Sequence, residues 1–113
     1  MDDIGRKALL FDFYGPLLTE KQREVYECAV DEDMSLGEIA ESMGVSRQAV
    51  HDMMRRTGKI LEEYESKLGL AEKFLDIENH LEKIRVLVDH QNPTEQELAI
   101  AREIEAIDLI ERK

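Results

Sequence analysis

Seven polar or basic residues between positions 46 and 59 have side chains suited to contacting nucleic acid. They are Ser46, Arg47, Gln48, His51, Arg55, Arg56 and Lys59. Arg and Gln hydrogen-bond base edges in the major groove, while Ser46 and the free backbone amides beside it can hold a phosphate. The segment carries a net charge of about +3 in a chain whose formal net charge is −11. We predict a nucleic-acid-binding face here; the alternative is a set of solvated charges on a motif that binds only protein.

A helix-turn-helix is predicted to position these residues, because Ser35 to Arg56 carries its local signals in order. Ser35 with Glu38 has the spacing of a capping box at the start of a first helix. Gly44 lies where a tight turn requires positive φ, and Ser46 can cap a second helix. The apolar residues at helical spacing, predicted to face inward, are Ile39, Ala40, Met43, Val50, Met53 and Met54.

The rest of the chain is also predicted to be helical, so the fold class is all-α. Hydrophobic residues make up 42%, only two prolines interrupt the chain, and no long stretch alternates apolar with polar residues. The other expected helices cover residues 4–18, 19–30, 71–90 and 94–110, and the second motif helix continues to about Lys67. A break is expected at Leu68-Gly69-Leu70, because glycine is unfavourable inside a helix.

Two domains are predicted, a helix-turn-helix domain over residues 1–66 and a group of C-terminal helices over residues 67–113. The C-terminal helices carry a wider apolar stripe than a two-helix hairpin can bury within itself. They are expected to pack on the first domain, to pair with a second copy or to bind a partner protein. Of these, we favour a homodimer.

The acidic composition limits the partners that the chain can have. A net charge of −11 argues against non-specific binding to nucleic acid, which depends on Lys and Arg neutralising phosphates. It leaves room for a local basic strip that restricts docking to one face. A basic protein partner is the other interpretation.

Residues that would indicate an enzyme, a metal site or a membrane segment are not found. There is no nucleophile–base pair or phosphate-binding glycine loop, which predicts no catalytic residues and no cofactor. Cys28 is the single cysteine, and Asp31-Glu32-Asp33 lacks the spaced ligands of a calcium loop, so no metal site is expected. No signal peptide or transmembrane-length apolar run is present, which predicts a cytoplasmic protein with no membrane partner.

Two families resemble this sequence. Residues 18–56 resemble region four of sigma-70 factors, through Leu18-Thr19 before Gln22-Arg23-Glu24-Val25 and through the two motif helices. Residues 6–110 resemble the YlxM family of small bacterial helix-turn-helix proteins. That resemblance rests on Phe11-Asp12-Phe13-Tyr14-Gly15-Pro16-Leu17-Leu18-Thr19 and on Ser46-Arg47-Gln48-Ala49-Val50-His51-Asp52 followed by a long helical tail.

The resemblance implies a sigma region 4-like helix-turn-helix bundle with a long C-terminal helical arm, in a bacterial, cytoplasmic regulatory protein. YlxM genes lie beside those of the signal recognition particle GTPase and its receptor, which implies a part in protein targeting. Binding of DNA or RNA through the second motif helix is one implied function. The alternative is an accessory protein that binds the targeting GTPase or its RNA and has no DNA-binding role. Sigma factors commonly have further basic residues where this chain has Ala49 and Asp52, which argues against strong promoter recognition.

Overall fold

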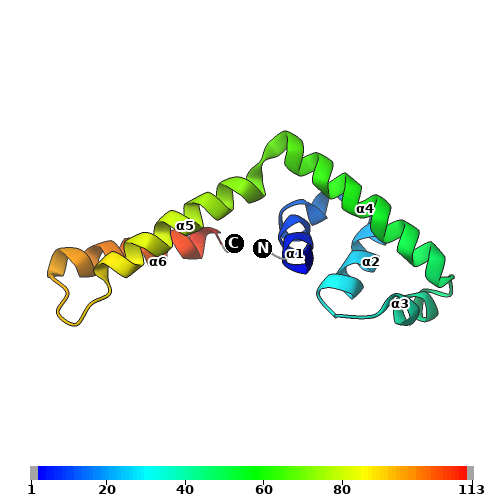
Figure 1. The fold of residues 1–113 in the computed structure, drawn as a ribbon, viewed down its shortest axis with the longest axis horizontal. Helices are drawn as coiled ribbons and strands as arrows, with labels where there is room; N and C mark the ends of the chain where they lie inside the picture. The colour runs from blue at the N-terminus through cyan, green and yellow to red at the C-terminus, as the bar shows by residue number, and fades with distance from the viewer. Residues whose placement is uncertain (1–2, 112–113) are drawn as a thin grey trace. The chain divides into compact units, whose positions relative to one another are not determined.

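The computed structural model describes residues 3–111, and they form six α-helices and one 3-10 helix with no strand among them (Figure 1). The helices are α1 (Asp3–Tyr14), the 3-10 helix η1 (Gly15–Leu17), α2 (Glu20–Val30), α3 (Leu36–Met43), α4 (Arg47–Leu68), α5 (Leu70–Val88) and α6 (Glu95–Glu111). The predicted all-α fold class is confirmed.

The contacts divide the chain into two compact units. Unit 1 extends to Glu72 and unit 2 begins at Lys73. Unit 1 therefore holds α1 to α4 and the first turn of α5, and unit 2 holds the remainder of α5 with α6. The two predicted domains, residues 1–66 and 67–113, stay a prediction.

Local capping begins the helices of unit 1 where the sequence predicts. Thr19 and Gln22 form one capping box, and Ser35 and Glu38 form another. Gly44 ends α3 at φ 69°, in the left-handed region that glycine adopts without steric cost. The first helix was expected to reach residue 18, but α1 ends at Tyr14. Pro16 has no amide hydrogen and disfavours α conformation before it, so the chain tightens into η1.

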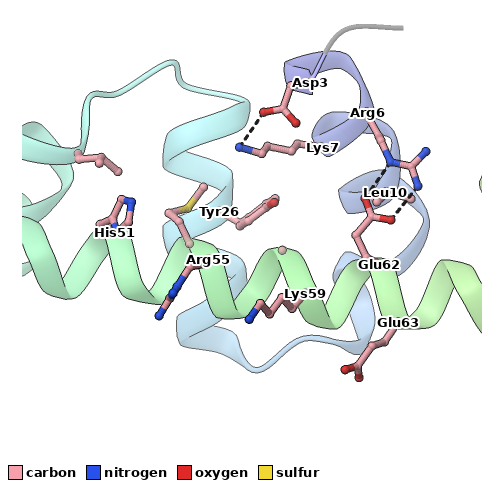
Figure 2. A pocket seen from close by; sticks show the side chains of 13 residues that line it. Asp3, Arg6, Lys7, Leu10, Tyr26, His51, Arg55, Lys59, Glu62 and Glu63 are labelled. Atoms are coloured by element: carbon pink, nitrogen blue, oxygen red, sulfur yellow. Dashed lines mark hydrogen bonds and ion pairs between the residues drawn. The ribbon is translucent and has the colours of Figure 1, made fainter.

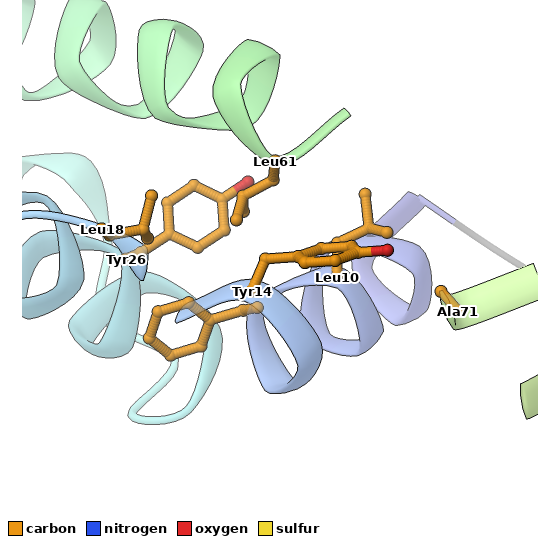
Figure 3. Close-up of a cluster of buried hydrophobic side chains, with 7 residues drawn as sticks. Leu10, Tyr14, Leu18, Tyr26, Leu61 and Ala71 are labelled. Atoms are coloured by element: carbon orange, nitrogen blue, oxygen red, sulfur yellow. The ribbon is translucent and has the colours of Figure 1, made fainter. Parts of the chain in front are cut away.

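The core of unit 1 is formed by two apolar clusters that share α4. One cluster joins α1, α2 and α4 with the start of α5 (Figure 3), and contains Leu10, Phe11, Tyr14, Leu18, Tyr26, Leu61 and Ala71. The other joins α2, α3 and α4 through Val25, Ile39, Ala40 and Val50. Met54 packs against both clusters. The long helix α4 is therefore held along much of its length, from the helix-turn-helix to the α4–α5 turn.

The α4–α5 turn is fixed by a hydrogen-bonded group that we call the junction clamp, made of Tyr14, Glu65 and the first amides of α5. The Tyr14 hydroxyl donates to Glu65 Oε1 at 2.5 Å and accepts from the Leu70 amide at 3.1 Å. The Glu65 carboxylate also accepts from the amides of Ala71 and Glu72, both at 3.0 Å. Gly69 makes the turn at φ 63°, as its position predicts. Glu65 thus supplies the N-terminal cap that α5 needs.

In unit 2, ion pairs join α5 to α6. Arg85 pairs with Asp108, lies 4.0 Å from Glu105 and bonds Glu82 of its own helix at 3.0 Å. Thr94 accepts from the Glu97 amide at 3.1 Å, and Glu97 bonds both His90 and Thr94.

The apolar side chains of α6 are only partly buried within unit 2. Ile107 and Ile110 are 39% and 69% exposed, while the acidic residue Asp108 is 6% exposed. The charge of Arg85 explains this difference, because a guanidinium between two helices requires a buried carboxylate partner. Ile104, at 3% exposed, packs within unit 2.

Candidate nucleic-acid interface

The predicted nucleic-acid-binding residues lie at the N-terminus and along the first turns of α4, and all of them are exposed. Arg47, His51, Arg55 and Lys59 follow one another at four-residue spacing, which places them in one row along the helix. Gln48 and Arg56 lie in the neighbouring row, with Asp52 between them. We call these six residues with Ser46 the recognition face.

The opposite side of α4 packs into the core and so orients the recognition face. Val50 is 2% exposed against Ile39 and Ala40 of α3, and Met53 and Met54 are half-buried. Because the turn at Gly44 and the cap at Ser46 set where α4 begins, the basic rows emerge on the solvent side. The structure therefore brings the seven predicted residues together on one helix.

The basic side chains of the recognition face are not neutralised within residues 3–111. Arg47, Arg55, Arg56 and Lys59 form no ion pair there. Asp52 is the acidic residue of the second row. Its Oδ1 lies 3.8 Å from His51 Nδ1 and accepts a hydrogen bond from the Gln48 side-chain amide at 3.2 Å. That bond fixes Gln48 in one orientation and leaves its carbonyl oxygen and second amide hydrogen for a ligand.

Ser46 serves first as the N-cap of α4. Its hydroxyl oxygen accepts from the Ala49 amide at 3.1 Å. The hydroxyl hydrogen is still available to donate, and the remaining first-turn amides point out of the helix end. The chemistry expected for a phosphate contact is present, although one of the amides is already satisfied by the cap.

A groove borders the recognition face, and sequence reasoning did not identify it. It is lined by His51, Arg55 and Lys59, together with Lys7 of α1 and Tyr26 of α2 (Figure 2). Ser46, Arg47, Gln48 and Arg56 do not line it. Lys7 and Tyr26 are far from α4 in sequence, so only the packing of three helices reveals their proximity.

Three carboxyl groups of unit 2 also lie close together. Oxygens of Glu78, Asp108 and Glu111 are within 4.8 Å of one another. Burial and a hydrogen bond with Glu78 raise the pKa of the Glu111 carboxyl, and Asp108 is already paired with Arg85. One carboxylate of this group therefore already has its counter-charge within unit 2.

No helix within residues 3–111 is both long enough and apolar enough to cross a membrane.

Relatives of the chain are found in several bacteria. UPF0122 protein STH1464 of Symbiobacterium thermophilum is 47% identical over 103 residues, covering 90% of this chain and 91% of the relative. UPF0122 protein BH2485 of Halalkalibacterium halodurans is 45% identical over 111 residues, covering 98% and 99%. A UPF0122 protein of Bacillus thuringiensis is 42% identical over 109 residues, covering 96% and 99%.

The model of one protein family matches residues 1–101 and is described as "Putative helix-turn-helix protein, YlxM / p13 like". This description names a helix-turn-helix motif and no enzymatic activity, and α3, the Gly44 turn and α4 form such a motif within the matched residues. Together with relatives that match over nearly their whole length, it confirms the resemblance to the YlxM family. The chain belongs to the UPF0122 family of YlxM/p13-like helix-turn-helix proteins.

Proposed function

We propose that this protein is a cytoplasmic regulatory protein that binds duplex nucleic acid through the recognition face. The observation that carries the proposal is the row of exposed, unpaired basic residues on the N-terminal half of α4, held outward by packing of its opposite side. In helix-turn-helix proteins the first turns of the second helix enter the major groove. Arg47 and Gln48 occupy that place.

The direct test compares Arg47→Ala with Lys67→Ala. Lys67 is exposed in the last turn of the same helix, outside the recognition face, so it is a matched control for charge. If Arg47 contacts a base, Arg47→Ala weakens binding to the specific duplex by about 1–3 kcal/mol, and Lys67→Ala leaves it unchanged. Unchanged affinity of Arg47→Ala for every nucleic acid tested would refute the assignment.

Salt dependence gives a second measure of the same interface. Four basic residues neutralising four phosphates give a slope of log affinity against log salt no steeper than about −3.6 for one chain on duplex DNA. Duplexes from the neighbourhood of the protein's own gene and the RNA of the signal recognition particle are measured side by side. Preference for duplex DNA supports a transcriptional role, and preference for the RNA supports a part in protein targeting.

A second function, as an accessory of the signal recognition particle GTPase, is favoured by the acidic side of unit 1. Exposed carboxylates follow α2 and the turn after it, at Glu20, Glu24, Glu27, Asp31, Glu32 and Asp33. Such a surface complements a basic protein. Co-purification with the GTPase that weakens as salt rises is the expected result, whereas a complex indifferent to salt argues against this interface.

We further propose that unit 2 forms a homodimer. Large apolar side chains on α5 and α6 are more exposed than is usual on the surface of a monomeric protein. The most exposed are Val86 at 68%, Leu87 at 75%, Leu109 at 65% and Ile110 at 69%. A second hairpin of the same sequence would cover them as a four-helix bundle.

A further inference from the structure

The groove beside the recognition face has the size and shape of a small-molecule site. Its volume is about 640 Å³, within the range of ligand pockets, and all of its lining residues belong to unit 1. The apolar part of the lining comes from Leu10, Tyr26, Leu36 and Met54. The charged part comes from Asp3, Arg6 and Lys7 of α1 on one side and from α4 on the other (Figure 2).

Tyr26 presents its hydroxyl to the groove. The residue is 1% exposed, and its ring packs against that of Phe11 with centroids 5.5 Å apart. Tyr26 lines the groove, and its hydroxyl makes no hydrogen bond to a described residue. Because this oxygen is not one of the enclosed polar atoms of residues 3–111, it is reached from the groove. Burial raises the pKa of Tyr26, so the hydroxyl stays protonated and can donate at neutral pH.

Gly58 keeps this hydroxyl accessible. A Cβ at position 58 would lie 3.4 Å from the Tyr26 oxygen, inside the groove. A glycine in a helix interior costs about 1 kcal/mol relative to alanine, and no turn or positive φ requires one here. An alanine methyl at this position would lie in van der Waals contact with the hydroxyl and fill part of the space in front of it.

The charge balance of the groove favours an anion. Its acidic residues Asp3 and Glu62 are paired with Lys7 and Arg6, at 3.1 and 2.7 Å. Arg55 and Lys59 project from the same side of α4 and have no ion-pair partner within residues 3–111 (Figure 2). A phosphate would be attracted to these two cations, while Glu63 on the same rim opposes the attraction without pairing either of them.

We propose that the groove binds a nucleotide, with its base on the apolar lining against the Tyr26 hydroxyl and its phosphate on Arg55 and Lys59. An apolar surface, one oriented hydroxyl and two free cations match the base and the phosphate of this ligand class. The nucleotide comes either from solution or from an extrahelical position of a nucleic acid. The second source rests on the proposed function, whereas the first is independent of it.

Isothermal titration calorimetry with ATP and AMP tests the first source. A duplex with one extrahelical adenosine, compared with the same duplex fully paired, tests the second. Tyr26→Phe removes only the unpaired hydroxyl and is expected to weaken nucleotide binding about five- to tenfold. Gly58→Ala is expected to weaken it as well while raising the melting temperature, and Lys67→Gln, outside the groove, leaves it unchanged.

The two possible failures are distinguishable. If the nucleotide site exists, Tyr26→Phe lowers the affinity for ATP or for the duplex with an extrahelical adenosine, and leaves the affinity for the fully paired duplex unchanged. If the proposed duplex interface exists, Arg47→Ala lowers the affinity for the fully paired duplex and leaves ATP binding unchanged. The nucleotide site is refuted if millimolar ATP, AMP and the extrahelical adenosine produce no binding beyond that of the paired duplex. It is equally refuted if they bind wild type, Tyr26→Phe and Gly58→Ala with the same affinity.

Discussion

Thr57 places a hydroxyl in the core of unit 1 without a hydrogen-bond partner among residues 3–111. The residue is 1% exposed, and its Oγ1 is fully enclosed. Thr57→Val replaces this hydroxyl by a methyl group of nearly the same shape, so it should stabilise the fold by about 1 kcal/mol. Urea unfolding measures the difference, with Thr57→Ser as a control that keeps the hydroxyl and loses the methyl. A Thr57→Val variant less stable than wild type would mean that the hydroxyl has a bound partner.

Glu65 makes stability depend on acidity. Burial alone raises the pKa of its carboxyl, but the hydrogen bonds from Tyr14 and from the Ala71 and Glu72 amides outweigh burial and leave the pKa lowered. Because the folded state binds this proton less readily than the unfolded chain, the carboxylate stabilises the fold above the unfolded pKa of about 4.3. That stability is lost as pH falls through the lower, folded pKa.

The measurement is the free energy of unfolding from pH 7 to pH 3 in wild type and in Glu65→Gln. Wild type should lose stability in the acid range, and the variant, already less stable at pH 7, should lose less. The pKa of Glu62 is lowered by its hydrogen bond with Arg6, so Glu62 should cause some loss of stability at acidic pH in both proteins. Identical pH profiles would show that Glu65 is not ionised in the clamp.

The predicted site residues could be identified from the sequence because they belong to one helix and its N-cap. Arg47 and Lys59 are placed by the four-residue spacing of α4 alone. Tyr26 lies on α2, and its place in the groove appears only when α1 and α4 are packed around it. No pattern within α2 carries that information.

Among the elements, the turn between α4 and α5 depends on one glycine. Gly69 has φ 63° with no atom near an added Cβ, so Gly69→Ala is penalised by backbone conformation and not by a clash. The expected loss is about 1–2 kcal/mol. Gly37→Ala is the matched control, because Gly37 is helical within α3 and its Cβ would meet only Ser35 Oγ, at 3.9 Å.

Gly37→Ala should be neutral or slightly stabilising, since alanine favours helix. Both variants are measured by thermal unfolding under the same conditions. Equal destabilisation by the two substitutions would contradict a role for positive φ at Gly69.

Elements that begin with local capping were predictable from sequence, and those fixed by distant partners were not. Thr19 with Gln22, and Ser35 with Glu38, lie three residues apart, so their pattern is visible in the chain. Tyr14 and Glu65 are separated by 51 residues, and the sequence shows them only as an aromatic and an acidic residue on two helices. The burial of Asp108 against Arg85 was missed for the same reason.

For the whole molecule, the exposed apolar residues of unit 2 predict a dimer that a charge should disrupt. Leu87→Glu places a carboxylate in the proposed interface, and Gln91→Glu adds the same charge at an exposed position between α5 and α6. Sedimentation equilibrium should show dimers for wild type and Gln91→Glu and monomers for Leu87→Glu. A monomeric wild type at high micromolar concentration would exclude this assembly.

The junction clamp limits how the protein can be divided. The helix-turn-helix of α3 and α4 is not independent of α1, because α1 carries Tyr14, whose hydroxyl accepts a hydrogen bond from the Leu70 amide and donates one to the Glu65 carboxylate. A fragment that starts at residue 18 and keeps α4 and α5 would therefore leave Glu65 without its buried hydroxyl partner and the Leu70 amide without its acceptor. Transferring this helix-turn-helix to another protein without α1 would therefore remove part of the junction clamp, which joins the end of α4 to the start of α5.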